Sequence, residues 1–291
     1  MKLNLILVTG ILAMAGTSSL ALATDLQPEN PAFLSGAFEI GAWLDSYSQT
    51  DGPDAATLFG GYASAFANAS LTDAVTLGVD IQGELLPTVA VPFKDHTASL
   101  EGAIGANLVY HSNPINFGVF GAIGKTNSQP SDDGLGFMGG GVFGLDVSED
   151  TLLYTQVGYA DIRVDQTDSG FSGWFADGGV IHAFSDQFAV RVAGAYGYAP
   201  IGYEDTNDWG SFWDVGIKGA YALSDTSPIF LTASYNYSQF TANTEDDGHE
   251  HNFKLGLSIG FGGTQKAKDT FNPYGTPLLP FRAAAYGEVL D

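Results

Sequence analysis

The chain has 291 residues, no cysteine and a formal net charge of −23, with 33 acidic residues against ten lysines and arginines. This acidity argues against nucleic acid as a partner, because phosphate contacts need clustered lysine and arginine. Without cysteine, disulfides are excluded and stability must come from other interactions.

The first 23 residues predict a secretory signal peptide. Lys2 precedes an apolar run that ends at Ala21-Leu22-Ala23, which fits a small-x-small cleavage site. The alternative is an uncleaved membrane anchor, which the short and glycine-interrupted run disfavours. No later stretch approaches the roughly 20 consecutive apolar residues of a membrane-spanning helix. Residues 24–34 are expected to form a short periplasmic segment before the first strand.

Between residues 35 and 262 the sequence alternates with period two, as β-strands do. For example, Val75, Leu77 and Val79 share one face, whereas Asp80 and Glu84 share the other. Most strips are about 12 residues long, which suits a tilted membrane strand and its rims. In the strips at 57–69 and 171–184, the alternation does not show which of the two faces is the apolar one. About 12 strands are predicted, over residues 35–47, 57–69, 74–86, 97–111, 114–125, 135–146, 151–163, 171–184, 188–199, 209–223, 229–240 and 251–262.

The connections between the strips alternate between short and long. Short turns are expected at 71–73, 112–114, 147–150, 185–186 and 224–225, and longer stretches such as "SQTDGPDAA" and "APIGYEDTND" lie between them. Outer-membrane barrels have this arrangement, with short periplasmic turns and longer extracellular loops. A closed barrel also gives every backbone N–H and C=O a partner inside hydrocarbon.

The second face of the strips decides between a membrane barrel and a soluble one. It is mainly Gly, Ala, Ser and Asn, and charged residues make up only 15% of the chain. A β-sandwich or lipocalin-like barrel would need many more charges on its outer face. The prediction is therefore an all-β, transmembrane, antiparallel up-and-down β-barrel of about 12 strands, with a range of about 10–14.

Residues 35–262 resemble the bacterial outer-membrane β-barrel proteins of the porin-like kind. The last strip, Phe253 to Phe261, is similar to that family's terminal strand, in which alternate hydrophobic residues end in an aromatic. In the family this aromatic is usually the last residue, whereas 30 residues follow it here. The resemblance implies a location in the outer membrane, contact with lipid and lipopolysaccharide, recognition of this strand by the barrel assembly machinery, and passage of small solutes.

Inward-facing charged residues are the candidates for a functional site. They are Glu39, Asp45, Asp80, Glu84, Glu101, Arg191, Asp214, Lys218 and Lys254. A ring of charges in a lumen sets ion selectivity, so the acidic majority predicts a preference for cations if the lumen is open. The alternative is a salt-bridge network that fills the barrel, for instance with Arg191 paired to Asp214 on the adjacent strip.

Metal binding and catalysis have little support in the sequence. His249, Glu250 and His251 in "EDDGHEH" form a weak transition-metal candidate on an expected loop, and otherwise no metal or cofactor is predicted. No histidine has a nucleophile motif beside it, so no enzyme is expected. The acidic long loops are either solvated, or attract cations at the pore mouth, or bridge Ca²⁺ and Mg²⁺ to surface polysaccharide.

The last segment, residues 263–291, changes character. It contains Pro273, Pro277 and Pro280 and cannot form another central strand. An extended periplasmic tail is expected; the alternative is that Leu278, Leu279 and Phe281 tuck into the barrel mouth as a plug.

The sequence thus predicts a passive channel for small solutes with a cation preference. A non-conducting barrel for structure, adhesion or polysaccharide contact is the alternative, and lipid hydrolysis is a third hypothesis. The solute and the oligomeric state are not predicted.

Overall fold

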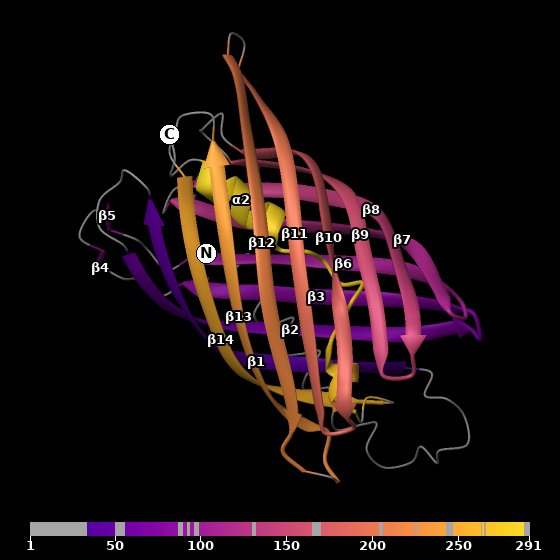
Figure 1. The fold of residues 1–291 in the computed structure, drawn as a ribbon. Coiled ribbons are helices and arrows are strands. Elements are labelled where there is room, and N and C mark those ends of the chain that lie inside the picture. The colour runs from indigo at the N-terminus through magenta and orange to yellow at the C-terminus, as the bar shows by residue number, and fades with distance from the viewer. Residues whose placement is uncertain are drawn as a thin grey trace.

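The structure is a computed structural model that describes residues 34–49, 56–86, 90–91, 94–95, 99–129, 132–164, 170–203, 206–224, 226–242, 247–262, 264 and 266–287. Twelve antiparallel strands form a closed barrel in which each strand pairs with its neighbours in chain order, and β1 pairs with β14 (Figure 1). The predicted fold class is confirmed. The predicted signal peptide, and nearly all of the short segment after it, lie outside the described residues.

The strands agree with the predicted strips to within a few residues at most ends. They are β1 (Leu34–Gln49), β2 (Ala56–Thr72), β3 (Val75–Leu86), β6 (Ser99–Ser112), β7 (Ile115–Gln129), β8 (Asp132–Ser148), β9 (Thr151–Val164), β10 (Gly170–Ser185), β11 (Phe188–Tyr203), β12 (Thr206–Ala222), β13 (Ile229–Ala242) and β14 (Asp247–Phe261). A small hairpin of β4 (Ala90–Val91) and β5 (Lys94–Asp95) lies between β3 and β6.

Two connections that were expected to be long loops are largely strand. The hairpins β7–β8 and β11–β12 continue to Gln129 and Asp132, and to Tyr203 and Thr206. Paired strands can extend beyond the membrane because each supplies the other's backbone partners. Figure 1 shows β11 and β12 projecting well past their neighbours. We call this end of the barrel the long-loop end and the opposite end the short-turn end.

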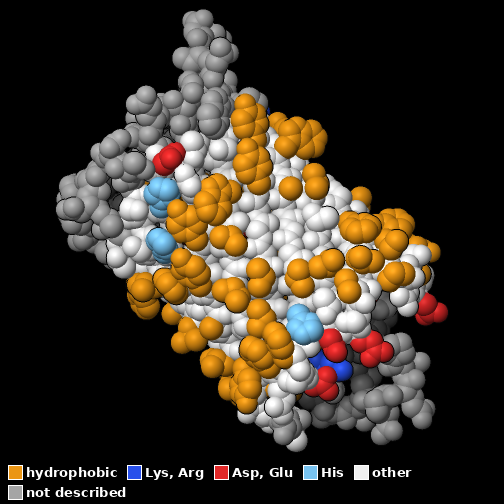
Figure 2. Space-filling model, in the orientation of Figure 1, with side chains coloured by type: hydrophobic (Ala, Val, Ile, Leu, Met, Phe, Trp, Pro, Cys, Tyr) orange, Lys and Arg blue, Asp and Glu red, His pale blue; other side chains and the backbone are white. Residues whose placement is uncertain are grey.

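The apolar faces of the strands point outward. In β7, Phe117, Val119 and Ile123 are exposed, whereas Phe120 and Ala122 between them are buried. Figure 2 shows hydrophobic side chains across the barrel wall, with charged side chains only toward its two ends. Such a surface suits hydrocarbon, and a water-soluble barrel would turn these side chains inward.

Aromatic side chains lie on the outer surface near both ends. Tyr159 and Trp174 pack edge to face with ring centroids 5.3 Å apart toward the long-loop end. Phe184 and Phe188 stack at 5.5 Å beside the short turn between β10 and β11. Two aromatic belts of this kind are typical of the membrane–water interfaces of a barrel.

After β14 the chain turns into the barrel. Gly262 has a φ of +64°, and a Cβ there would strike the carbonyl of Leu34. The 3₁₀ helix η1 (Ala267–Thr270) lies at the short-turn end, and the chain then runs through the lumen to α2 (Leu279–Gly287), as the yellow ribbon in Figure 1 shows. Among the described residues, no helix is long and apolar enough to cross a membrane.

The expectation of an extended periplasmic tail is therefore wrong for residues 264–287, which we call the C-terminal segment. Phe281 is fully buried, and Leu278 and Leu279 pack against the same cluster, as the plug alternative required. The physical reason is the inner wall itself, which presents large apolar side chains that need a partner other than water.

Candidate functional site

The lumen has two unlike walls. The apolar wall is formed by inward side chains of β7 to β10: Phe120, Ala122, Met138, Val142, Ala160, Ile162, Phe171 and Phe175. The charged wall is formed by inward side chains of β12, β14, β1 and β3: Lys218, Glu250, Lys254, Glu39, Asp45, Asp80 and Glu84. The C-terminal segment lies between the two walls.

The apolar wall holds the C-terminal segment by close packing. The ring of Phe281 lies so near the backbone of Gly124 that a Cβ at that glycine would overlap it. Phe171 and Phe175 point inward toward this cluster, while Trp174 between them points outward. This arrangement explains why the parity of the strip at 171–184 is ambiguous, because both of its faces meet apolar surroundings. The inward aromatic residues were missed by the sequence analysis.

Amide side chains of the barrel bind the backbone of the C-terminal segment in the middle of the lumen. Nδ2 of Asn107 donates to the carbonyl of Tyr274 at 3.0 Å. Nε2 of Gln156, which is buried, donates to the carbonyl of Gly275 at 3.1 Å. These bonds satisfy carbonyl groups of a segment that has no regular secondary structure.

Thr276 makes the contact with the charged wall at the same level. Its backbone N–H donates to Oδ2 of Asp80 at 3.2 Å, and its carbonyl accepts from Nε2 of Gln82 at 2.5 Å. Asp80, which was predicted to set ion selectivity, is thus also an anchor for the C-terminal segment.

Glu39 is the centre of one cluster on the charged wall. Nζ of Lys218 lies 2.7 Å from Oε2 of Glu39, and the hydroxyls of Tyr62 and Thr232 donate to Oε1 at 2.6 and 3.0 Å. The carboxylate has a partner for both oxygens, as a buried charge requires.

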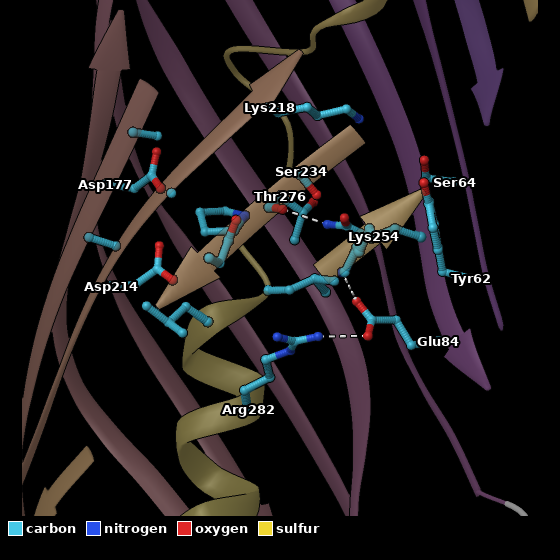
Figure 3. A pocket seen from close by; sticks show the side chains of 18 of the residues that line it. Tyr62, Ser64, Glu84, Asp177, Asp214, Lys218, Ser234, Lys254, Thr276 and Arg282 are labelled. Carbon is cyan, nitrogen blue, oxygen red and sulfur yellow. Dashed lines mark hydrogen bonds and ion pairs between the residues drawn. The ribbon is translucent and has the colours of Figure 1, made fainter. Parts of the chain in front are cut away.

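Arg282 of α2 joins two strands of the charged wall. Its Nη2 lies 2.6 Å from Oε2 of Glu84 in β3, and its Nη1 lies 3.0 Å from Oε1 of Glu250 in β14. Lys254 also pairs with Glu84. Figure 3 shows Arg282 reaching from the helix to Glu84, with Lys254 on the other side of the carboxylate. Glu101 faces Glu84 directly across the β3–β6 pair.

Arg191 has different partners from those predicted. Its Nη2 lies 3.9 Å from Asp177 of β10, and its Nε donates to the hydroxyl of Tyr154 at 2.5 Å. Asp214 instead accepts from the hydroxyl of Ser238 at 3.0 Å. The predicted Arg191–Asp214 pair is wrong, because the register sets Arg191 opposite Lys218. Asp177 was missed because the parity of its strip was ambiguous.

Three cavities follow one another along the C-terminal segment. The first, of about 250 Å³, and the second, of about 140 Å³, share Gln82, Thr276 and Pro277 in their linings. The third, of about 410 Å³, shares Phe271 and Pro273 with the second and lies at the short-turn end. Six predicted site residues line the first cavity: Glu39, Glu84, Arg191, Asp214, Lys218 and Lys254. Its long-loop side ends at Arg282 and Leu279.

The weak metal candidate does not form a site. His249, Glu250 and His251 lie in β14 and not in a loop, so Glu250 points inward to Arg282 while both histidines point to the other face. His249 and His251 bond to the hydroxyls of Tyr237 and Tyr235 at 2.8 and 2.9 Å. Within the described residues, no group of three metal-binding side chains occurs.

The comparisons with known proteins concern the fold. No family model matches the sequence, and no curated protein matches it. Among solved structures, an outer-membrane channel from Pseudomonas putida F1 is similar at 10% identity and a TM-score of 0.53, covering 81% of this chain and 100% of that one.

Two further structures are similar at lower TM-scores. The toluene transporter TodX of Pseudomonas putida has 9% identity and a TM-score of 0.42, over 84% of this chain and 92% of its own. The KdgM porin has 9% identity and a TM-score of 0.39, over 76% and 99%. The chain thus shares the barrel fold of the outer-membrane channel from Pseudomonas putida F1. Its apolar outer surface is of the kind that a membrane-spanning barrel presents to lipid.

Proposed function

We propose that the barrel is a narrow passive channel for small solutes with a preference for cations. The observation that carries this proposal is the row of three cavities that share lining residues along the C-terminal segment. The path follows the charged wall, because the apolar wall is filled by Phe281 and its neighbours. The proposed activity is transport and involves no chemical reaction.

The cation preference is supported by the charges that line this path. Among the side chains that the structure describes in the middle and long-loop half of the barrel, eight acids and three bases point inward. The acids are Glu39, Asp45, Asp80, Glu84, Glu101, Asp177, Asp214 and Glu250; the bases are Arg191, Lys218 and Lys254. Arg282 of the C-terminal segment adds a fourth base. A confined path with an acidic excess attracts cations and repels anions.

The buried C-terminal segment favours the second candidate, a non-conducting barrel with a structural or surface role. In that case the cavities are closed water-filled spaces, and the acidic loops would contact polysaccharide. Lipopolysaccharide contact, assembly through Phe253–Phe261, and periplasmic short turns remain predictions for either candidate.

Recording from the purified full-length barrel in a planar bilayer separates the two candidates. The channel proposal expects small discrete current steps and a reversal potential of cation-selective sign in a salt gradient. A folded but silent barrel would support the non-conducting candidate, and an anion-selective sign would remove the cation preference.

A matched pair of variants locates the selectivity. Asp214→Asn neutralises a lumen acid that has a hydrogen bond from Ser238 and can keep it. Asp161→Asn neutralises an outward acid that pairs with the exposed Arg163. Only the first should shift the reversal potential toward zero; equal shifts would place the selectivity outside the lumen.

A further inference from the structure

Three carboxylates lie close together beside the first cavity: Glu84 of β3, which lines it, Glu101 of β6 and Glu250 of β14. We call them the carboxylate site. Glu84 and Glu101 are directly opposite each other in the β3–β6 pair, an arrangement of like charges that is destabilising on its own. The wall therefore needs cations at this position, and Lys254 of β14 supplies one of them to Glu84.

Arg282 supplies a second cation from the C-terminal segment. Its two Nη atoms contact Glu84 and Glu250, whose side chains are only 6% and 1% exposed. One planar guanidinium thus bridges two strands through two separate N–H groups. Guanidinium is the cation whose rigid donor fork fits paired carboxylates, whereas an ammonium acts as a point charge.

The carboxylate site has acceptor capacity that Arg282 does not use. Oε1 of Glu101 is buried and has no hydrogen-bond partner among the residues that the structure describes. The adjoining cavity of about 250 Å³ is lined by both Glu84 and Arg282, so a small solute in it can reach the Glu84 carboxylate. Figure 3 shows the Arg282 side chain beside this cavity, extended from α2.

We infer that the carboxylate site binds the guanidinium group of a small solute and that Arg282 occupies it in the solute's absence. This inference rests on the proposed channel function and names its solute class. Exchange of one guanidinium for another keeps Glu84 and Glu250 paired, while the Arg282 side chain moves into the cavity. A neutral solute or an anion that displaced Arg282 would take the guanidinium away from Glu84 and Glu250 and leave Glu84 with Lys254, which is unfavourable for buried carboxylates.

Binding to the purified barrel in detergent tests the site without any current. Titration calorimetry with methylguanidinium would compare the full-length chain with Arg282→Ala and Arg282→Gln. Removal of the resident guanidinium should tighten methylguanidinium binding by about tenfold or more, and methylammonium, which has the same charge but no planar fork, should bind at least about tenfold more weakly.

Two controls assign the effect to the carboxylate site. Lys266→Ala removes a positive charge from the same segment at an exposed ion pair with Asp186, and it should leave methylguanidinium binding unchanged. Adding Glu250→Gln to Arg282→Ala should abolish the gain in affinity for methylguanidinium. Where the alanine variant does not fold, Arg282→Lys keeps the buried charge, and binding should then be intermediate because an ammonium is the weaker competitor.

The inference is overturned if the Arg282 variants bind methylguanidinium no better than the full-length chain, or no better than methylammonium. Equal binding of Mg²⁺ would also overturn it, by showing a site for any cation. Because binding and current are measured separately, failure of the guanidinium site can be distinguished from failure of the channel proposal. Methylguanidinium binding in a silent barrel would contradict the channel, and currents without binding would contradict only the guanidinium site.

Discussion

The apolar wall and the charged wall face the same C-terminal segment but make different contacts with it. On the apolar wall, the ring of Phe281 packs closely against the backbone of Gly124. On the charged wall, Thr276 and Arg282 make polar contacts, and a cavity is lined by both of them. Apolar side chains gain from excluding water, whereas charged ones lose hydration when they are covered. One wall therefore holds the segment, and cavities remain beside the other, where we propose that the path lies.

Deletion of residues 264–291 should have the largest effect. The outward pattern of the strands does not depend on the segment, so the barrel should still fold in lipid. Without the segment the lumen of a 12-stranded barrel is unobstructed, and single-channel conductance should rise by roughly tenfold. Bilayer recording of both proteins measures this. An unchanged conductance would show that the path does not run through the lumen.

Phe281→Ala should weaken the hold of the apolar wall. Truncating a fully buried phenylalanine costs about 3–5 kcal/mol, which here is lost from the docking of the C-terminal segment. The expected result is frequent large openings and faster proteolysis within 264–287. Phe184→Ala is the control, because that ring is 66% exposed on the outer surface. Similar gating in both variants would contradict the role given to the apolar wall.

Glu39→Gln should have an intermediate effect on the charged wall. It leaves Lys218 without its carboxylate, and because the Lys218 side chain is 28% exposed, the cost should be about 1–2 kcal/mol and not that of a fully buried pair. The reversal potential should also move toward zero. A double-mutant cycle with Lys218→Gln measures the coupling by thermal unfolding, and a coupling near zero would contradict the pairing.

Lys266→Ala should have the smallest effect on stability. Its ion pair with Asp186 spans 2.8 Å between side chains that are 50% and 75% exposed. The hydrogen bond to Asp186 raises the pKa of Lys266 above its ordinary value. Solvent screens such pairs, so the midpoint of thermal unfolding should hardly change. A loss as large as that of Phe281→Ala would show that the short-turn end carries the docking of the segment.

The barrel was predictable because period-two alternation records which face meets lipid. Residues such as Phe117 and Val119 need only a local pattern to be placed outward, and parity then places Glu39, Glu84 and Lys254 inward. Inward direction was therefore predictable residue by residue. The partners were not, because register across strands decides that Arg191 meets Asp177 and not Asp214.

The path of the C-terminal segment was not predictable from periodicity. Residues 271–278 form no helix or strand, and their backbone is held by side chains such as Asn107 and Gln156 from distant strands. One signal was present: the strip at 171–184 is apolar on both faces. In a barrel with a water-filled lumen, inward positions like Phe171 and Phe175 would be polar or small. A strand that is apolar on both faces therefore indicates that another part of the chain packs inside the barrel.

A reversible cross-link between the C-terminal segment and the wall tests the central claim most directly. A Cβ at Gly105 would overlap Oγ1 of Thr276, so the two residues are neighbours and the segment must shift slightly to admit a side chain there; Gly105→Cys with Thr276→Cys should then form a disulfide in a chain that has no other cysteine. We predict that the oxidised protein passes only the small steps of the full-length chain, and that a reductant restores large openings when combined with Phe281→Ala. Failure of the two cysteines to cross-link, or large openings with the disulfide intact, would contradict a lumen occupied by residues 264–287.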